Sequence, residues 1–231
     1  MTRRNKLLKF TENLTFPNVF ESFEFGNPEL TGFKGEKINM TGKWGDNHFK
    51  STNPVTLELA CGRGEYCLGL AERYPDRNYI GVDIKGARIW KGAKIALENE
   101  MTNVAFLRSK IESLELFFAE NEVSEIWITF PDPFLKESKY NRRLTSPNFL
   151  NIYRKILHYK GVINLKTDSE PFYLHTKEVI KEYNHHLIID SSDIYANSLP
   201  HPDLDILTFY ERMHLKDNRT IRYLQFRLDQ S

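Results

Sequence analysis

Two acidic residues and a glycine loop have the types and spacing to bind a nucleoside-containing ligand. Glu58 lies within the apolar run 55–60, a loop with Gly62 and Gly64 follows, and Asp83 ends the next apolar run. Glycine lets the backbone approach a ligand closely, and the helix start that follows offers unpaired N–H groups to an anion. A carboxylate at the end of the second strand is placed to hydrogen-bond ribose hydroxyls. We therefore predict a site for a nucleoside-containing cofactor.

The charge of the loop indicates which cofactor. A dinucleotide fingerprint requires a third Gly or Ala at position 67, where the sequence has Cys67. A pyrophosphate would be repelled by Glu58, whereas a cationic cofactor would be stabilised by it. S-adenosylmethionine carries a sulfonium and an ammonium, so Glu58 and Asp83 together favour it over NAD. The alternative is that Glu58 only accepts hydrogen bonds from N–H groups of its own loop.

A second candidate is Asp132, which stands between Pro131 and Pro133 after the fourth expected strand. Two prolines hold this carboxylate in a stiff extended turn, which pre-organises it. Phe130 and Phe134 on either side offer faces on which a base could stack. The alternative is a rigid turn whose aromatic residues fill the core, but that interpretation leaves the fixed acid unexplained.

Basic residues follow directly, and further polar residues end later elements. Lys136, Lys139, Arg142 and Arg143 flank Tyr140, a pattern typical of phosphate contacts beside an aromatic ring, although such runs are often a solvated face. Three further residues are expected to line the same cleft, or else to cap their loops: Asp168, Thr208 and Glu211.

Alternating strand and helix patterns must position these residues. The sequence predicts strands at 55–60, 78–83, 104–107, 125–130, 162–167, 187–190 and 221–228. It predicts helices at 66–73, 87–100, 111–120, 146–158 and 170–183, with Gly161 closing the fourth of them. This alternation indicates an α/β fold with a mainly parallel sheet and helices on both faces. Ligands of such sheets bind at the carboxyl ends of the strands, near the point where strand order reverses.

Composition excludes several classes of protein. The 231 residues are 40% hydrophobic and 27% charged, typical of a globular protein rather than a disordered one. The 32 Lys and Arg balance the 31 Asp and Glu, so net charge gives no sign of nucleic-acid binding. Two cysteines, Cys61 and Cys67, make no disulfide scaffold, and no zinc-type cluster is present, so we expect no metal. With no apolar run near the ~18 residues of a membrane span and no apolar leader, we expect a soluble cytoplasmic protein without a membrane partner.

The first fifty residues differ from the rest. Arg3, Arg4, Lys6 and Lys9 form a basic segment, and an irregular lead-in with Phe16, Phe20, Phe23 and Phe25 follows. We expect residues 1–50 to be a basic arm and lead-in that anchors aromatic side chains on the body, and residues 51–231 to be the domain that binds S-adenosylmethionine. The cations could grip phosphates or simply be solvated.

Several of these motifs occur together in one order. The ordered set is Glu58 with its glycine loop, Pro131-Asp132-Pro133, Lys136, Arg142-Arg143-Leu144, Lys166-Thr167-Asp168, and Thr208-x-x-Glu211. From about residue 4 to about residue 228 the sequence resembles the bacterial tRNA (guanine-N7)-methyltransferase family. The Asp-Pro stretch with its downstream Arg-Arg-Leu and late Thr-x-x-Glu is specific, whereas the glycine loop alone would indicate only a methyltransferase.

The resemblance implies a fold, a reaction and residue roles. The fold is a doubly wound, Rossmann-like, mostly parallel sheet with one antiparallel strand. The reaction is methyl transfer from S-adenosylmethionine to N7 of guanine 46 in the variable loop of tRNA, by a monomer or homodimer. The implied cofactor contacts are Glu58, Gly62, Gly64, Asp83, Lys110, Ile111 and Asp132, with Asp132 also the catalytic or guanine-facing acid. The implied substrate contacts are Lys136, Asp168, Thr208 and Glu211, beside the basic pair Arg142 and Arg143.

The sequence also departs from the family pattern. Ala60 replaces a glycine before the loop, Asp83 replaces a frequent Glu, and Lys110 replaces an acid, so that an adenine contact there would use the backbone. Rival interpretations are a methyltransferase of another RNA, a protein or a small molecule, an NAD-linked oxidoreductase, and a non-catalytic RNA-binding relative.

Overall fold

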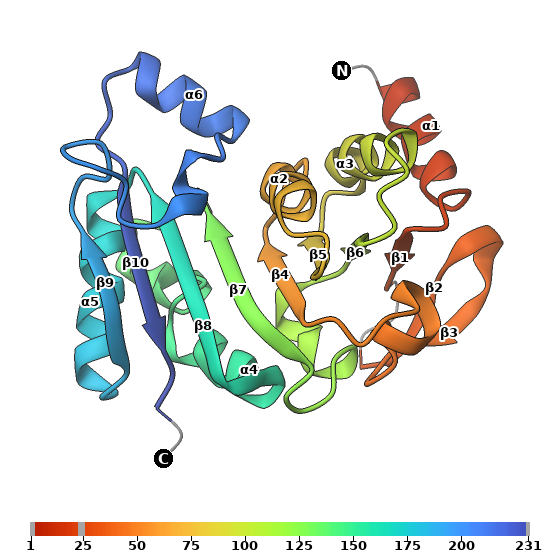
Figure 1. The fold of residues 1–231 in the computed structure, drawn as a ribbon, viewed down its shortest axis with the longest axis horizontal. Helices are drawn as coiled ribbons and strands as arrows, with labels where there is room; N and C mark the ends of the chain where they lie inside the picture. The colour runs from red at the N-terminus through yellow and green to blue at the C-terminus, as the bar shows by residue number, and fades with distance from the viewer. Residues whose placement is uncertain (1–2, 23–25, 230–231) are drawn as a thin grey trace.

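Five consecutive buried residues make β4 (Val55–Leu59) a central strand of the sheet. In a computed structural model that describes residues 3–22 and 26–229, ten strands form one sheet in the order β3-β2-β1-β6-β5-β4-β7-β8-β10-β9 (Figure 1). The other strands are β1 (Val19–Glu21), β2 (Glu29–Thr31), β3 (Lys37–Asn39), β5 (Asn78–Asp83), β6 (Val104–Arg108), β7 (Val123–Thr129), β8 (Leu157–Thr167), β9 (His186–Ser191) and β10 (Arg222–Arg227).

Helices connect these strands. The α-helices are α1 (Arg3–Asn13), α2 (Glu65–Arg73), α3 (Gly86–Glu98), α4 (Pro147–Ile156), α5 (Glu170–Glu182) and α6 (Phe209–Lys216). The short helical turns are η1 (Phe33–Gly35), η2 (Trp44–Phe49), η3 (Ile111–Leu116), η4 (Glu137–Arg142) and η5 (Pro202–Asp205). None of the helices within the described ranges combines the length and the apolar character needed to cross a bilayer.

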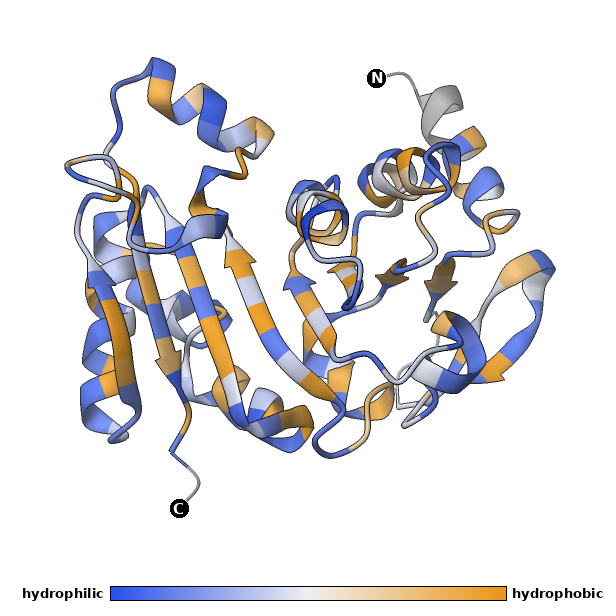
Figure 2. Ribbon diagram, viewed as in Figure 1, coloured by the Kyte–Doolittle hydropathy of each residue, from blue (hydrophilic) through white to orange (hydrophobic). Residues whose placement is uncertain are grey.

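Two hydrophobic cores lie on opposite faces of the sheet. Leu70 of α2 and Ile89 of α3 belong to one, and Leu150 of α4 and Phe172 of α5 belong to the other. Figure 2 shows hydrophobic bands along β7 that alternate with pale and hydrophilic ones, and hydrophilic stretches on α6. The expected α/β architecture with helices on both faces is confirmed, because buried strands need cover on each side.

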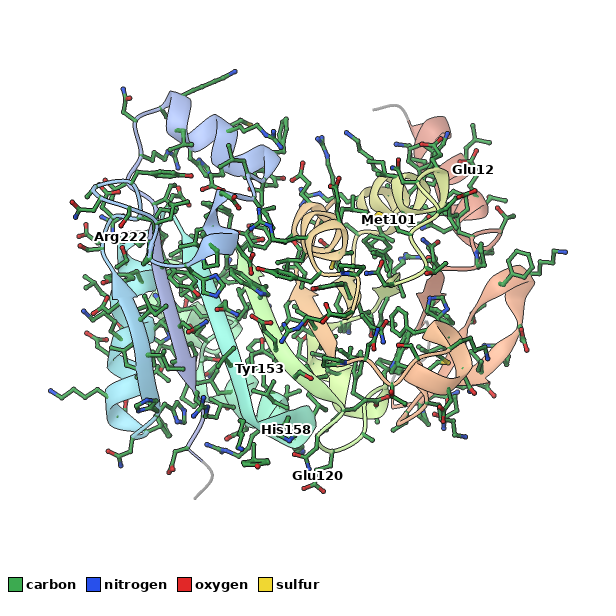
Figure 3. All side chains as sticks on the ribbon, in the orientation of Figure 1. Glu12, Met101, Glu120, Tyr153, His158 and Arg222 are labelled. Atoms are coloured by element: carbon green, nitrogen blue, oxygen red, sulfur yellow. The ribbon has the colours of Figure 1, made fainter. Side chains whose placement is uncertain are left out.

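The sheet is mostly parallel, as predicted. Strands β6, β5, β4, β7 and β8 pair in parallel, whereas β10 runs antiparallel to both β8 and β9, and β2 runs antiparallel to β1 and β3. The strand order reverses between β4 and β7, so the carboxyl ends of these two strands flank the switch point. In Figure 3, Glu120 and His158 mark the opposite, amino-terminal edge of the sheet.

The expectation of an irregular lead-in was wrong. β1 pairs in parallel with β6, and β2 and β3 extend the sheet beyond it. Trp44 is fully buried, its Nε1–H donates to the carbonyl of Phe117 at 2.8 Å, and its ring stacks on Phe118. Strands of three residues show no clear period in sequence, which is why they were missed. Phe23 and Phe25 lie outside the described residues, as do the side chains of residues 3–7.

Two other boundaries also differ. Gly161 does not end a helix: α4 ends at Ile156 and Gly161 lies within β8. A Cβ at Gly161 would lie 2.6 Å from Cγ of Leu157 and 2.8 Å from the carbonyl oxygen of His158, so glycine is needed where the strand packs against its own start. The helix predicted at 111–120 is the shorter turn η3.

Candidate active site

A cavity of about 1120 Å³ opens at the carboxyl ends of β4, β5, β6, β7 and β8. Its lining contains the sequence-predicted residues Glu58, Gly62, Asp83, Lys110, Ile111, Asp132, Arg142, Asp168 and Thr208. Four predicted residues do not line it, namely Gly64, Lys136, Arg143 and Glu211. Residues from five strand ends therefore meet in one hollow, as parallel topology requires.

Glu58 is a buried acid on the floor of this cavity. The backbone N–H of Cys67 donates to its Oε2 at 2.9 Å, and the hydroxyl of Thr129 donates to its Oε1 at 3.3 Å. Burial raises the pKa of Glu58 to about 7, although the hydrogen bond from Cys67 opposes this shift. A carboxylate that is costly to ionise because it is buried would be stabilised by a cationic ligand.

Asp83 closes the same end of the site from the neighbouring strand. Its Oδ2 accepts from the N–H of Gly62 at 2.9 Å, and its Oδ1 accepts from the N–H of Lys85 at 2.7 Å. These bonds fix the carboxylate, and each oxygen keeps a lone pair for a hydroxyl donor. Nothing lies within 4 Å of a Cβ built on Gly62, which has a φ of +58°. The backbone there is open to a ligand.

Asp132 stands on an exposed turn between two strained residues. Phe130 and Phe134 have φ values of +48° and +43°, in the left-handed region that costs a non-glycine residue about 1–3 kcal/mol. The N–H of Phe130 donates to the carbonyl of Lys166 at 2.8 Å, which ties the turn to β8. The side chain of Asp132 is solvent-exposed and faces the cavity. The strained backbone holds this carboxylate over the site rather than in the core.

These groups fit S-adenosylmethionine. Glu58 offers a buried negative charge, Asp83 offers acceptors for ribose hydroxyls, and the backbone at Gly62 is accessible. Ala60, where the family often has glycine, adopts a φ of +55°, so the chain keeps the backbone shape of a glycine there. Among the residues that the structure describes, no group of three or more His, Cys, Asp or Glu could hold a metal ion.

Comparison with known proteins identifies the family. A family model described as "Putative methyltransferase" matches residues 52–224. The tRNA (guanine-N(7)-)-methyltransferase of Christiangramia forsetii is 44% identical over 229 residues, which cover 99% of this chain and 100% of that protein. That of Porphyromonas gingivalis is 45% identical over 93% of this chain and 86% of its own length. The chain belongs to the tRNA (guanine-N(7)-)-methyltransferase family.

Solved structures share the fold of this family member. The 16S rRNA methyltransferase KamB aligns with a TM-score of 0.63 at 15% identity, covering 84% of this chain and 96% of that one. A 30S ribosomal A1408 methyltransferase from an uncultured bacterium aligns with a TM-score of 0.57 at 18% identity, over 84% and 97% of the two chains. The predicted Rossmann-like methyltransferase fold is thus confirmed.

Within the methyltransferase, Gly64 has a packing role. It has a φ of +68°, and a Cβ there would lie 2.4 Å from Cε1 of Phe106, a ring buried under α2 and α3. The close approach that requires glycine is therefore to the core and not to a ligand. Gly64 is not among the residues that line the cavity, and its contact with the cofactor stays a prediction.

The two arginines of the methyltransferase separate into different environments. Arg142 is exposed and lines the cavity. Arg143 is buried, its Nε–H donates to the carbonyl of Phe134 at 3.3 Å, and its guanidinium lies 5.7 Å from the ring of Tyr140. Arg143 thus holds the loop that carries Asp132 and keeps little exposed surface, so Arg142 is the better placed of the two for a phosphate contact. Lys136 is exposed and is not among the residues that line the cavity.

Asp168 and Thr208 line the cavity with partners of their own. Asp168 Oδ2 forms an ion pair with Arg219 at 2.8 Å, and its Oδ1 lies 3.7 Å from Nε2 of His214. Thr208 caps α6, because its Oγ1 accepts from the N–H of Glu211 at 3.1 Å. Both residues can still present oxygen atoms to the cavity.

Glu211 does not lie in the cavity. It is fully buried, its Oε1 accepts from the Tyr195 hydroxyl at 2.7 Å, and its Oε2 forms an ion pair with Lys166 at 2.7 Å. Burial lowers the pKa of Lys166, and the Glu211 charge opposes that shift. Both carboxylate oxygens of Glu211 have partners in the protein interior, and the expected substrate contact stays a prediction.

Sequence reasoning missed the aromatic turn that roofs the site. Phe209, Tyr210 and His214 of α6 line the cavity, and the two former side chains are 40% exposed. The guanidinium of Arg63 lies 4.3 Å from the ring of Phe209, whose N–H donates to Oε2 of Glu65 at 2.7 Å. The available signal in the sequence was the pair of adjacent aromatic residues, Phe209 and Tyr210, directly after the helix cap Thr208.

Proposed function

We propose that this protein transfers a methyl group from S-adenosylmethionine to N7 of a guanine in tRNA, at position 46 of the variable loop. The observation that carries the proposal is a buried carboxylate, Glu58, in one cavity with Asp83 and the exposed acid Asp132. Relatives at 44–45% identity, named tRNA (guanine-N(7)-)-methyltransferase, support the tRNA guanine. Position 46 rests on the family resemblance.

The residues divide into a cofactor half and a substrate half. Glu58 would balance the positive charge of the cofactor, and Asp83 would accept from its ribose hydroxyls. The bound cofactor supplies a methyl group on a cationic sulfur. Lys110 and Ile111, which follow β6 at the cavity wall, would contact the adenine.

Guanine N7 needs positioning rather than deprotonation. Its lone pair lies in the ring plane, so no proton must leave before attack, and in-line placement is the main requirement. Asp132 can accept from the N1–H and N2–H₂ edge of the base and so orient it. Methylation adds positive charge to the ring, and a nearby carboxylate stabilises that charge more in the transition state than in the ground state.

Substrate RNA would meet the cavity mouth around Arg142, Asp168 and Thr208. Arg142 would contact phosphate, while Asp168 and Thr208 would accept or donate hydrogen bonds to the nucleotide. Since a tertiary stack hides reactive atoms, local opening of the variable loop belongs to the proposal. The protein acts as a monomer or homodimer in the cytoplasm, where its tRNA substrate is found.

Labelled-nucleoside mapping tests the function. The protein is incubated with tritiated S-adenosylmethionine and an unmodified tRNA transcript, and the digested nucleosides are separated. Label in 7-methylguanosine, lost when position 46 is changed to adenosine, is the expected result. Label in another nucleoside or at another guanine would replace the proposal with a different RNA specificity. No turnover, together with intact cofactor binding, would indicate a non-catalytic RNA-binding relative.

A further inference from the structure

Helix α6 brings Thr208, Phe209, Tyr210 and His214 to the cavity, and its apolar contact with the core comes from the partly buried Leu215. Among its eight residues, all described, the one that is buried is Glu211. A surface helix normally packs through an apolar stripe. Here a carboxylate occupies the fully buried inward position, so the groups that hold that carboxylate help to hold the helix.

Lys166 is the partner of this carboxylate. Its ammonium is fully buried and lies 2.7 Å from Oε2 of Glu211. It also donates to the hydroxyl of Tyr66 at 3.0 Å and to the carbonyls of Leu204 and Ile206 at 2.9 and 3.3 Å. One side chain of β8 therefore joins α2, the segment that leads into α6, and α6 itself.

This pair is separate from substrate contact. Both side chains have no exposed surface, and neither residue lines the cavity. Their connection to the site is through the backbone: Lys166 directly precedes Thr167-Asp168 at the end of β8, and its carbonyl accepts from the N–H of Phe130. Lys166 thus lies beneath the Asp132 turn as well as beneath α6.

We propose that Lys166 and Glu211 are positioning residues that hold the aromatic first turn of α6 over the cavity for tRNA. This inference rests on the proposed methyl transfer to tRNA. It gives the Thr-x-x-Glu motif a divided task, since the Thr caps the helix and the Glu anchors it. Neither carboxylate oxygen of Glu211 touches the base or the ribose.

The test is a double-mutant cycle on tRNA methylation. Lys166→Met and Glu211→Met are each compared with wild type and with the double variant, by kcat/KM for tRNA, Kd for S-adenosylmethionine and unfolding temperature. Wild-type turnover into 7-methylguanosine is measured first, so that failure of the proposed function is recognised separately.

Each single variant should lower kcat/KM for tRNA by about 10-fold or more, because it leaves a buried charge unpaired. Cofactor Kd should change by less than about 3-fold, since Glu58 and Asp83 lie on other elements. The double variant should regain most of the lost kcat/KM, because two apolar side chains can pack where the ion pair stood. A folded double variant as inactive as Glu211→Met would overturn the inference and indicate that Glu211 contacts the substrate.

Two further variants keep the result decisive if a methionine variant does not fold. Glu211→Gln keeps the size of the side chain and the hydrogen bond from Tyr195, but it leaves the buried charge of Lys166 unpaired, so it should also lower kcat/KM for tRNA by about 10-fold. A wild-type kcat/KM in Glu211→Gln would overturn the inference. Glu125→Gln is the matched control: it breaks an ion pair with Arg77 at 2.7 Å near the opposite edge of the sheet, and should lower the unfolding temperature without changing kcat/KM.

Discussion

At the scale of single residues, the site depends on the carboxylate of Glu58, which is buried where its charged form is disfavoured. Glu58 is fully enclosed and receives two hydrogen bonds, and its pKa is still raised to about 7 because burial outweighs them. Such displaced pKa values cluster at functional sites. The sequence located this residue correctly, because an acid inside an apolar strand is unusual, but no sequence pattern could give the extent of its desolvation.

Glu58→Gln should weaken binding of S-adenosylmethionine and stabilise the empty protein. A raised folded-state pKa means that stability is highest below the unfolded value of 4.5 and is lost as pH rises through 7. The amide has no charge to desolvate, so it should gain up to about 3 kcal/mol relative to wild type between pH 5 and pH 8. Denaturant unfolding at the two pH values measures this, and calorimetry at pH 8 should show a Kd at least about 10-fold weaker. Unchanged affinity would remove the role of the carboxylate in binding the cationic donor.

Asp132→Ala should lower turnover far more than cofactor affinity. The carboxylate is exposed on its turn, so its removal costs little folding energy. We expect kcat to fall by about 100-fold or more while the Kd for S-adenosylmethionine changes by less than about 3-fold. Single-turnover kinetics beside calorimetry separate the two quantities. An equal loss of both would place Asp132 with the cofactor instead of the base.

At the scale of elements, the central strands and their helices follow the sequence prediction closely, whereas side-chain environments in the loops do not. Apolar runs bounded by Gly and Pro identify β4, β5 and β7 to within two residues. Adjacent residues in a loop have no such period, so the opposite environments of Arg142 and Arg143 were invisible. The Lys166–Glu211 pair was also invisible, since it joins elements distant in sequence.

The two arginines should therefore respond differently to substitution. Arg142→Ala should weaken tRNA binding and reduce the slope of log Kd against log salt by about one, because one phosphate contact is lost. Arg143→Ala should leave that slope unchanged and lower the unfolding temperature, since it removes the bond to the carbonyl of Phe134. Binding titrations at several salt concentrations and thermal unfolding distinguish these results. Equal salt slopes for both variants would indicate that Arg142 is a solvated surface residue without a phosphate contact.

At the scale of the whole molecule, the described part of the first fifty residues contributes β1, β2 and β3 to the sheet. β1 covers the edge of β6, and the ring of Trp44 lies between Phe20 of this region and Phe118 of the main body. The division into residues 1–50 and 51–231 stays a prediction about function, but the hydrophobic core crosses it.

Trp44→Ala should destabilise the entire protein by about 3–5 kcal/mol, the usual cost of removing a buried aromatic ring. One cooperative unfolding transition, shifted to lower denaturant concentration, is the expected result. A variant that unfolds in two steps, with the main body unaffected, would show that residues 1–50 form a separate unit. Tyr159→Ala, at an exposed aromatic residue on β8, is the matched control and should change stability little.

The near-neutral titration of Glu58 has a consequence for the energetics of ligand uptake. Because burial raises the pKa of Glu58 to about 7, part of the ligand-free protein carries this proton near neutral pH, and a cation seated beside the carboxylate would displace it. Uptake of the methyl donor should then release protons to the buffer. The measured heat should differ between phosphate and Tris, whose ionisation enthalpies differ, and this buffer dependence should vanish in Glu58→Gln.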